Sequence, residues 1–263
     1  MQLYSIASGS SGNCIYLGEE DGGILIDAGI SRKRIVTGLE RKGLSLDDIK
    51  AIFITHEHSD HISGPVLRKN PIPVYATADT VSAIWEKTNM NNISPELFHS
   101  IRPEEEIEAG EMLVRPFSIS HDAVDPVCYT VEKQGKRAAV ATDMGCFDDT
   151  IIRVLGQCDS VLIEANHDIN MLQVGPYPYS LKMRILGNKG HLSNTSCADL
   201  IKEILHKDLK HLVLGHLSRE NNFPQLAYRT VLDELEKTET WGTLDTRLMV
   251  ASRDEPTELL KIN

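Results

Sequence analysis

The sequence predicts an α/β fold in which two packed sheets carry helices on their outer faces. Short apolar runs alternate with amphipathic segments along the 263 residues, and this alternation favours layered sheets and helices. Several of the apolar runs end directly in a histidine or an aspartate. Neither a Pro/Ser-rich linker nor a low-complexity block divides the sequence, so we expect one domain over residues 1–263.

The first part of the chain is expected to form a strand meander followed by a helix. Glycine-rich turns separate the three short strands. The helix is predicted over residues 31–42, because Ser31 is a favourable N-cap and Gly43 a typical stop signal. The predicted strands are residues 3–7, 14–17 and 23–27.

The rest of the chain continues this alternation. The later predicted strands are residues 51–55, 74–76, a run from about 98 to 141 that turns at Gln134-Gly135, 161–164, 212–214 and 247–251. The later predicted helices are a short one near Asp60 that includes Val66 and Leu67, then 79–87, 148–155, 196–205 and 224–237. Residues 170–189 are expected to be mainly loop.

The segment Thr55-His56-Glu57-His58-Ser59-Asp60-His61 has the composition of a metal site, and it directly follows the apolar run 51–54. Imidazoles two positions apart in an extended chain point the same way, so His56 and His58 can bind one ion. Asp60 and His61 come where the chain turns and can face a second ion. Imidazole with carboxylate suits Zn, Fe or Mn better than Ca or Mg.

Three further residues of metal-binding type follow other predicted strands. They are His121, Asp143 and His216, and each lies on a turn that leaves a strand. Ligand and catalytic sites commonly lie on such turns. Together with the first cluster, these residues predict a site for two divalent metal ions.

The order of these residues resembles the metallo-β-lactamase superfamily over nearly the whole chain. The resemblance implies a four-layer αββα sandwich with a dinuclear site at one edge. An aspartate at position 143 resembles the phosphodiesterase branch and not the antibiotic-hydrolysing branch. Asp27, in Leu25-Ile26-Asp27-Ala28-Gly29, would support the site through hydrogen bonds. The implied ligands are His56, His58 and His121 for metal one, Asp60, His61 and His216 for metal two, and Asp143 as the bridge.

A closer similarity is to the YycJ/WalJ group of bacterial metallo-hydrolases. It is carried by residues 5–14, 164–168, 190–194 and 214–222. The resemblance implies a 5′-to-3′ exonuclease that acts on double-stranded DNA and takes part in mismatch repair. It also implies a genetic setting beside an essential cell-wall two-component system.

The expected reaction is attack of water on phosphorus, and two neighbouring ions would lower the pKa of that water toward neutrality. Asp60 can orient the nucleophile or accept its proton. The leaving oxygen needs a proton donor. We expect His191 to be this donor, because Gly190-His191-Leu192-Ser193-Asn194 resembles the Gly-His-Ser-Thr motif of tRNA 3′-end-processing enzymes, with leucine inserted after histidine. His167 is a second candidate donor, or a partner that orients a metal ligand.

The substrate contacts are expected on one segment and two turns. Between Asp168 and Asp199 the sequence has no acidic residue. Its basic side chains can follow a phosphate backbone and its tyrosines can stack on bases, or these charges only face water. Ser193 and Asn194 can cap the helix predicted over residues 196–205, and the N-terminus of that helix can receive a phosphate. The expected contacts are Asn13, Lys182, Arg184, Lys189, Ser193 and Asn194.

Composition limits the partners and the compartment. The net charge of −11 argues against a protein that coats nucleic acid, but not against a nuclease, because bound cations offset charge at the site. The five cysteines are scattered and form no C-x-x-C pair, and the N-terminus lacks a basic, then apolar, leader. We expect a cytoplasmic protein with reduced thiols and no membrane segment. Homo-oligomer formation is left open.

Three functions are compatible with these patterns. The leading hypothesis is a metal-dependent phosphodiesterase that acts as a DNA exonuclease. The second is a hydrolase of a small phosphodiester such as a cyclic phosphate, which the acidic composition and the lack of a clamp domain favour. The third is a non-catalytic, metal-stabilised partner of a two-component system. The complete set of expected ligands argues against the third.

Overall fold

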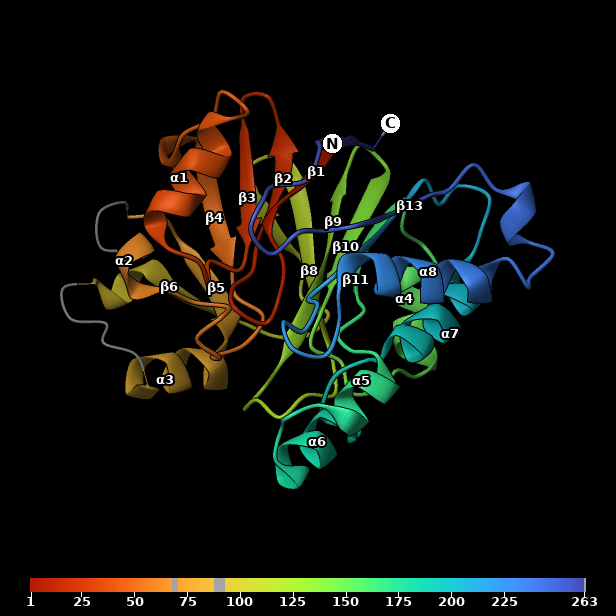
Figure 1. Ribbon diagram of the computed structural model, residues 1–263. Helices are drawn as coiled ribbons and strands as arrows, with labels where there is room; N and C mark the ends of the chain where they lie inside the picture. The colour runs from red at the N-terminus through yellow and green to blue at the C-terminus, as the bar shows by residue number, and fades with distance from the viewer. Residues whose placement is uncertain (68–70, 88–92, 263) are drawn as a thin grey trace.

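The computed structural model describes residues 1–67, 71–87 and 93–262. It confirms the expected αββα sandwich (Figure 1). Two seven-stranded sheets pack face to face, and helices cover the outer face of each. None of the described helices combines the length and the apolar character needed to cross a membrane.

The first sheet has the order β14-β1-β2-β3-β4-β5-β6. From β3 to β6 the strands run parallel, so their C-terminal ends lie at one edge of the sheet. The strands are β1 (Gln2–Ala7), β2 (Cys14–Glu19), β3 (Gly22–Ile26), β4 (Ile49–Phe53), β5 (Val74–Thr77), β6 (Phe98–Ile101) and β14 (Leu260–Lys261).

The second sheet repeats this arrangement in the order β13-β12-β11-β10-β9-β8-β7. From β10 to β13 the strands are again parallel. The strands are β7 (Ile107–Ala109), β8 (Met112–Ser118), β9 (Val127–Lys133), β10 (Lys136–Ala141), β11 (Ser160–Glu164), β12 (His211–Gly215) and β13 (Arg247–Val250).

The helices form two outer layers and a projecting arm. On the left of Figure 1 lie α1 (Arg32–Glu40), α2 (Gly64–Leu67) and α3 (Ala78–Lys87), and on the right lie α4 (Asp149–Leu155), α7 (Asn194–Ile204) and α8 (Pro224–Leu235). The arm contains α5 (Ile169–Val174) and α6 (Tyr179–Leu186) and extends below the sheets. Short 3-10 turns occur at Leu46–Asp48, Pro95–Leu97 and Trp241–Thr243.

Alternation along the strands explains why the chain forms four layers. Successive side chains of a strand point to opposite faces of its sheet. Ile24 and Ile26 of β3 therefore join the core between the two sheets, whereas Leu25 faces the core under the first helical layer. A third core packs the second sheet against α4, α7 and α8 and includes Leu155, Ile201 and others. Both faces of each sheet are thus buried.

The structure confirms most of the expected elements and corrects two. Ser31 caps α1, since its side chain accepts a hydrogen bond from the Arg34 N–H. Residues 170–189, expected as loop, contain α5 and α6. The short helix expected near Asp60 begins only at Gly64, so Asp60 lies in the loop after β4. That loop is held by contacts to other segments, which local sequence does not encode.

Candidate active site

Polar residues gather where the parallel strands of both sheets end. Asp27 follows β3, Asp143 follows β10, and His216 follows β12. All three have positive φ angles, of 60°, 61° and 53° respectively. Non-glycine residues rarely adopt this left-handed conformation, and it is concentrated at functional sites because the surrounding structure must enforce it.

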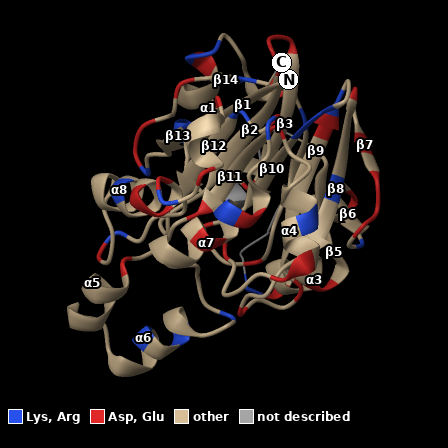
Figure 2. Cartoon of the chain, turned by 90° about the vertical axis from the view of Figure 1, so that its right-hand side faces the viewer, with Lys and Arg blue, Asp and Glu red and all other residues tan. Residues whose placement is uncertain are grey.

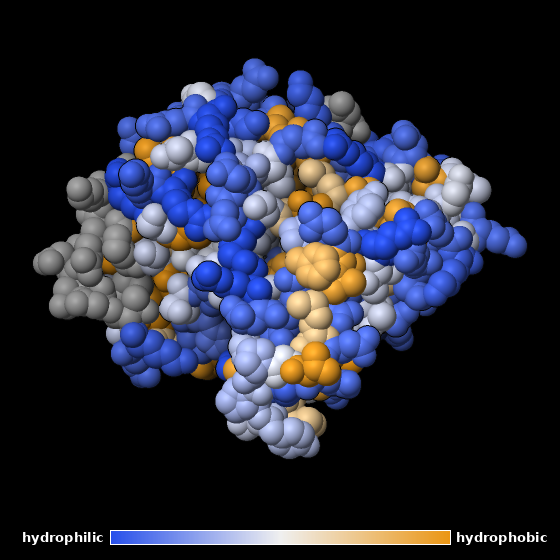
Figure 3. Space-filling view, in the orientation of Figure 1, coloured by the Kyte–Doolittle hydropathy of each residue, from blue (hydrophilic) through white to orange (hydrophobic). Residues whose placement is uncertain are grey.

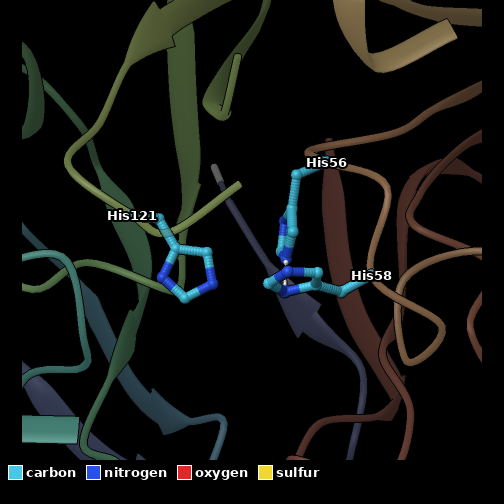
Figure 4. A group of neighbouring side chains, drawn as sticks. All are labelled: His56, His58 and His121. Carbon is cyan, nitrogen blue, oxygen red and sulfur yellow. Dashed lines mark hydrogen bonds between the residues drawn. The ribbon is translucent and has the colours of Figure 1, made fainter. Parts of the chain in front are cut away.

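The first ligand group is His56, His58 and His121. Their ring nitrogens include a set within 4.8 Å of one another, and His56 Nε2 lies 3.0 Å from His58 Nδ1. Figure 4 shows His121 facing the other two rings from the loop after β8. Three imidazoles that converge from two sheets provide the donor set of a transition-metal site.

The second ligand group is Asp60, His61 and His216, whose atoms also lie within 4.8 Å of one another. Asp143 lies between the two groups. Its Oδ2 is 3.3 Å from His61 Nε2 and 3.2 Å from His216 Nδ1, while its Oδ1 is 3.7 Å from His121 Nε2. The two carboxylate oxygens of Asp143 therefore face different ligand groups, as a bridging carboxylate requires.

The buried atoms of this cluster fit metal ions. His121 Nε2, Asp143 Oδ2 and His216 Nδ1 are buried and have no hydrogen-bond partner among the described residues. An unpartnered buried polar atom costs roughly 1–3 kcal/mol, so three of them at one point need an explanation. Coordination to divalent cations at the two groups would satisfy all three. The cluster can therefore hold metal, with the donors that Zn, Mn and Fe accept.

The charges of the site favour a cation. Burial holds the pKa of His56 well below its ordinary value. Burial opposes ionisation of Asp143, but His216 and His61 outweigh it and hold the carboxyl pKa well below its usual range. For His61, burial is outweighed by Asp27, Asp143 and Asp60, which raise its pKa. Carboxylates thus surround a point where positive charge is stabilised, by a proton or by a metal ion.

Asp27 is positioned to support the ligands. Its Oδ2 lies 2.7 Å from His61 Nδ1, and its Oδ1 accepts hydrogen bonds from the N–H and hydroxyl of Thr55 at 2.9 and 3.1 Å. A carboxylate on Nδ1 orients the ring so that Nε2 of His61 faces Asp60 and Asp143, as a metal ligand requires. Its hydrogen bonds are those that the predicted support role of Asp27 requires, and the role itself stays a prediction.

Glycine at position 29 allows the metal-binding loop to approach. A Cβ at Gly29 would lie 1.7 Å from the carbonyl oxygen of Asp60. The same carbonyl accepts a hydrogen bond from the N–H of Asn13 at 2.8 Å, so the loop at 8–13 supports it from the other side. Any side chain at position 29 would displace Asp60.

Asn13 lies inside the protein and not at a substrate surface, which corrects the expected substrate contact. It is fully buried. Its Oδ1 accepts the N–H of Gly9 at 3.0 Å, and its Nδ2 lies 3.2 Å from Nε2 of His61. The amide is thus used to hold the loop around the ligands.

His191 lies beside the ligands, as expected for a proton donor. Its Nδ1 is 2.7 Å from Oε1 of Glu164 and 3.6 Å from Oδ1 of Asp143. Burial lowers the pKa of the imidazole, but Glu164 and Asp143 outweigh this and raise it to about 9. The two carboxylates thus favour the protonated form of the ring.

Glu164 is a site residue that the sequence did not reveal. It is fully buried at the end of β11. Besides contacting His191, its Oε2 accepts hydrogen bonds from the N–H groups of Met144 at 2.9 Å and Leu192 at 3.1 Å. It thereby joins the loop that follows Asp143 to the His191 loop. The sequence signal that could have identified Glu164 was its place in segment 164–168, which resembles the YycJ/WalJ group.

His167 does not occupy either of its expected roles. It is 1% exposed, and neither ring nitrogen has a hydrogen-bond partner among the described residues. Burial lowers its pKa to about 4, so the ring is neutral. A buried neutral ring is a poor proton donor, and it orients no ligand. Asn166 instead holds His216, by donating from Nδ2 to its carbonyl at 2.9 Å.

Ser193 and Asn194 are also used within the protein. Ser193 is the N-cap of α7 and accepts a hydrogen bond from the N–H of Ser196 at 3.1 Å. Asn194, 1% exposed, exchanges side-chain hydrogen bonds with Asn222 at 3.2 and 2.8 Å. The capping expectation is confirmed for Ser193, whereas burial of both side chains corrects the expected substrate contacts.

The three basic residues of the expected DNA contact have different surroundings. Lys182 donates to the carbonyl of Gln173 at 2.7 Å, and Arg184 pairs with Asp122, next to His121. Lys189 is exposed and forms no ion pair with the described part of the chain. Figure 2 shows α6 with blue and no red along it, so the arm is locally basic in an acidic protein.

Comparison with known proteins places this geometry in a family. Residues 23–217 match the family model described as a β-lactamase superfamily domain. The chain is 37% identical to "Exodeoxyribonuclease WalJ" of Streptococcus pneumoniae serotype 2 (strain D39) over 98% of its own length and 97% of the relative's. It is 35% identical to "Exodeoxyribonuclease YycJ" of Bacillus anthracis over 88% of each chain.

A solved structure agrees on the fold. The metallo-β-lactamase fold protein YhfI of Bacillus subtilis superposes with a TM-score of 0.69 at 15% identity, over 98% of this chain and 99% of that one. The sequence matches, the αββα architecture and the converging histidines and aspartates point the same way. The chain belongs to the β-lactamase superfamily and, within it, to the family of the WalJ and YycJ exodeoxyribonucleases.

Proposed function

We propose that this protein is an exodeoxyribonuclease that removes nucleotides from the 5′ end of double-stranded DNA with the help of two divalent cations. The observation that carries the proposal is the pair of ligand groups that share Asp143, with the protonated ring of His191 beside them. The names of the two relatives support DNA as the substrate. The group resemblance alone supports a role in mismatch repair.

The chain's own residues account for the main chemical needs of phosphodiester hydrolysis. The seven ligands would hold the ions, which activate water and offset charge on the phosphate. Asp60, which is partly exposed at the cluster, would accept a proton from the attacking water. His191 would protonate the leaving oxygen, and Glu164 would keep its ring oriented and protonated.

The electrostatic distribution supports a nucleic-acid substrate despite the net charge of −11. The acid-free arm carries Lys182 and Arg184, and Lys189 follows it in sequence. Figure 2 shows blue and no red along α6. A local basic surface is enough to position a phosphate backbone, because phosphate contacts act over short distances in salt.

We further propose one catalytic domain over residues 1–263, with Mn, Zn or Fe as the resident metals. A cytoplasmic location is supported by the cysteines, all five of which are free. A small phosphodiester is the second candidate substrate. The observation that favours it is the size of the cavity beside His191, about 160 Å³, which suits a single small group better than a duplex.

The test is digestion of duplex DNA labelled at either end, by protein loaded with Mn²⁺ or Zn²⁺. A His61→Ala/Asp143→Ala variant removes ligands of the second group and the bridge. A His99→Ala/Asp245→Ala variant changes the same residue types at exposed positions. We expect stepwise loss of nucleotides from the 5′ end with the wild type and the exposed-site variant, and none with the ligand variant.

Two other results would change the assignment. Hydrolysis of bis(p-nitrophenyl) phosphate without any cleavage of DNA would favour the small phosphodiester. Inactivity on both substrates at full metal occupancy would favour a non-catalytic partner of a signalling system. Shortening of the DNA from the 3′ end would support nuclease activity but contradict the proposed 5′-to-3′ direction.

A further inference from the structure

A cleft of about 380 Å³ lies beside His121, and nothing in the reaction described above uses it. Its size is in the range of small-molecule sites, roughly 300–1,000 Å³. Ile119, Phe147 and Ile151 give it apolar walls. The polar side chains that line it are Ser118, Ser120, Lys189 and Asp148, whose carboxylate caps α4. Apolar walls with one aromatic ring are suited to a nucleobase.

The cleft and the smaller cavity are lined by different residues of two segments that contact each other. The segment at 120–121 meets the segment at 188–190, where the Ser120 hydroxyl donates to the carbonyl of Asn188 at 2.7 Å and His121 Nδ1 lies 3.1 Å from the carbonyl of Gly190. The cavity of about 160 Å³ is lined by His191, Tyr177 and Ser218 among others. Within the described chain, the two cavities share no lining residue.

If the protein hydrolyses DNA as proposed, the position of His191 determines which nucleoside each cavity binds. In an in-line displacement, water adds its oxygen to phosphorus and gives a proton to Asp60. The bond from phosphorus to the 3′ oxygen breaks, and that oxygen takes a proton from His191. The nucleotide that leaves is therefore next to His191, and the nucleoside that keeps the phosphate lies away from it.

We propose that the cleft beside His121 binds the nucleoside that retains the 5′-phosphate after cleavage. The released nucleotide leaves on the His191 side. This inference rests on the proposed function and deepens it, because it assigns the two nucleosides beside the scissile phosphate to different parts of the site. After each step the new 5′ end already lies in the cleft with its phosphate at the ligands. Lys189, exposed at the cleft, offers a positive charge to the next phosphate.

The reactivity of one cysteine that lines the cleft can report whether a ligand is bound there. Cys146 lines it and is half-buried, whereas the other cysteines, Cys14, Cys128, Cys158 and Cys197, are buried. We would measure the rate at which N-ethylmaleimide modifies the Mn²⁺-loaded protein. Saturating deoxyadenosine 5′-monophosphate should slow the modification at least ten-fold, and deoxyadenosine 3′-monophosphate less than two-fold. Cys146→Ser should abolish the rapid modification, which identifies the reacting thiol.

A second variant tests the cleft by filling it. Cys146→Trp should lower the ratio of DNA digestion to bis(p-nitrophenyl) phosphate hydrolysis at least ten-fold, because the small diester has no nucleoside to place. Tyr228→Trp, partly exposed on α8, adds bulk elsewhere and should leave the ratio unchanged. A folding defect in the Cys146 variant would lower both rates together and is recognised by the metal content and unfolding midpoint, in which case the protection assay decides.

The outcomes separate the two proposals. If DNA is not digested at all, the proposed function fails. If DNA is digested from the 5′ end but neither monophosphate protects Cys146, the cleft is not the nucleoside site. Equal protection by both monophosphates, or stronger protection by the 3′-monophosphate, would overturn the assigned orientation.

Discussion

The side chain of Glu164 shows how one buried carboxylate can orient a neighbouring histidine, here the proposed proton donor His191. It contacts His191 at 2.7 Å and also fixes two backbone N–H groups. Such a residue acts through its partner and not on the substrate. It was missed from the sequence because it ends an apolar strand, where a glutamate carries no local pattern that distinguishes a site residue from a strand end.

We predict that His191→Asn discriminates between leaving groups. The 3′ oxygen of DNA leaves as an alkoxide that needs a proton. The p-nitrophenolate group of the small diester leaves without one. Loss of a general acid costs about 10²–10⁴-fold, so DNA digestion should fall by about 10² or more while bis(p-nitrophenyl) phosphate hydrolysis falls less than about ten-fold. Steady-state rates on both substrates provide the measurement, and Glu164→Gln should give the same selectivity with a smaller loss.

Equal losses on the two substrates would show that His191 acts through metal binding or structure, and metal analysis of the purified variant would separate these. His206→Asn is the matched control. Its half-buried ring lies just after α7 and contacts the carbonyl of Cys158. This variant should leave both rates near those of the wild type.

His167 should make stability depend on pH. Its folded-state pKa is about 4, below the ordinary value near 6.5. As pH falls below about 6.5 the unfolded chain binds a proton that the folded protein excludes. Stability is therefore complete above that pH and is lost toward pH 4. Between pH 7.5 and 5.0 the loss should be on the order of 2 kcal/mol.

The measurement is urea unfolding of metal-free wild type and His167→Leu at both pH values. Metal-free protein is needed because ligand protonation would otherwise dominate the difference. The variant should lose about 2 kcal/mol less than the wild type on acidification. If both proteins lose the same free energy, the ring is accessible to protons in the folded state.

At the scale of elements, α5 and α6 form an arm whose surface differs from the rest of the protein. Val174 is 87% exposed and Tyr179 is 78% exposed, and Figure 3 shows apolar side chains gathered in this lower region below the start of α8. The basic residues of the arm are not equivalent. Lys182 and Arg184 already have partners, and Arg184 joins α6 to the loop that carries His121.

We therefore predict that Lys189→Ala weakens DNA binding alone, whereas Arg184→Ala weakens DNA binding and also affects the metal site. Removing one phosphate contact should lower the salt dependence of log K by about one unit. Arg184→Ala should also disturb the His121 loop, because Asp122 is left without its partner, and should lower metal content. Fluorescence anisotropy with duplex DNA over a salt series, together with metal analysis, distinguishes them.

Lys207→Ala, at an exposed position after α7, is the control for net charge. An unchanged salt slope in Lys189→Ala would remove this residue from the DNA interface. A slope that changes equally in the control would show that binding follows total charge and not a located contact.

Elements were predicted well where sequence patterns are local and poorly where the tertiary structure determines them. The alternating strands and the N-cap Ser31 follow from short-range chemistry. The arm was taken for loop because α5 and α6 are short, and glycines at 175 and 187 interrupt the pattern. Asn13 and Asn194 were placed at substrate because their burial depends on segments distant in sequence.

At the scale of the whole molecule, the two sheets contribute equivalent positions to one site. β3 and β10 each begin a set of parallel strands, and each leads to an aspartate with φ near 60°, Asp27 and Asp143. One aspartate supports a ligand through hydrogen bonds, and the other lies among the ligands. The strand arrangement repeats although the sequence shows no clear repeat, because different apolar side chains can pack in the same arrangement of strands.

The proposed metal ions would link the two halves of the sandwich. His56, His58, Asp60 and His61 follow β4 of the first sheet, while His121, Asp143 and His216 belong to the second. Ions that bind only the folded protein stabilise it by about 2.7 kcal/mol at a hundred-fold excess over Kd. For a chain of this size, that corresponds to an unfolding midpoint raised by roughly 5–11 °C.

We predict this shift between protein treated with chelator and protein reloaded with Mn²⁺ or Zn²⁺, measured by thermal unfolding at several metal concentrations. The midpoint should rise with the logarithm of metal concentration, as linkage requires. His216→Ala should reduce the shift, because it removes a ligand donated by the second sheet, whereas His211→Ala, a strand residue bonded to Ser160, should retain it. A midpoint independent of metal at full occupancy would mean that the ions do not hold the sheets together.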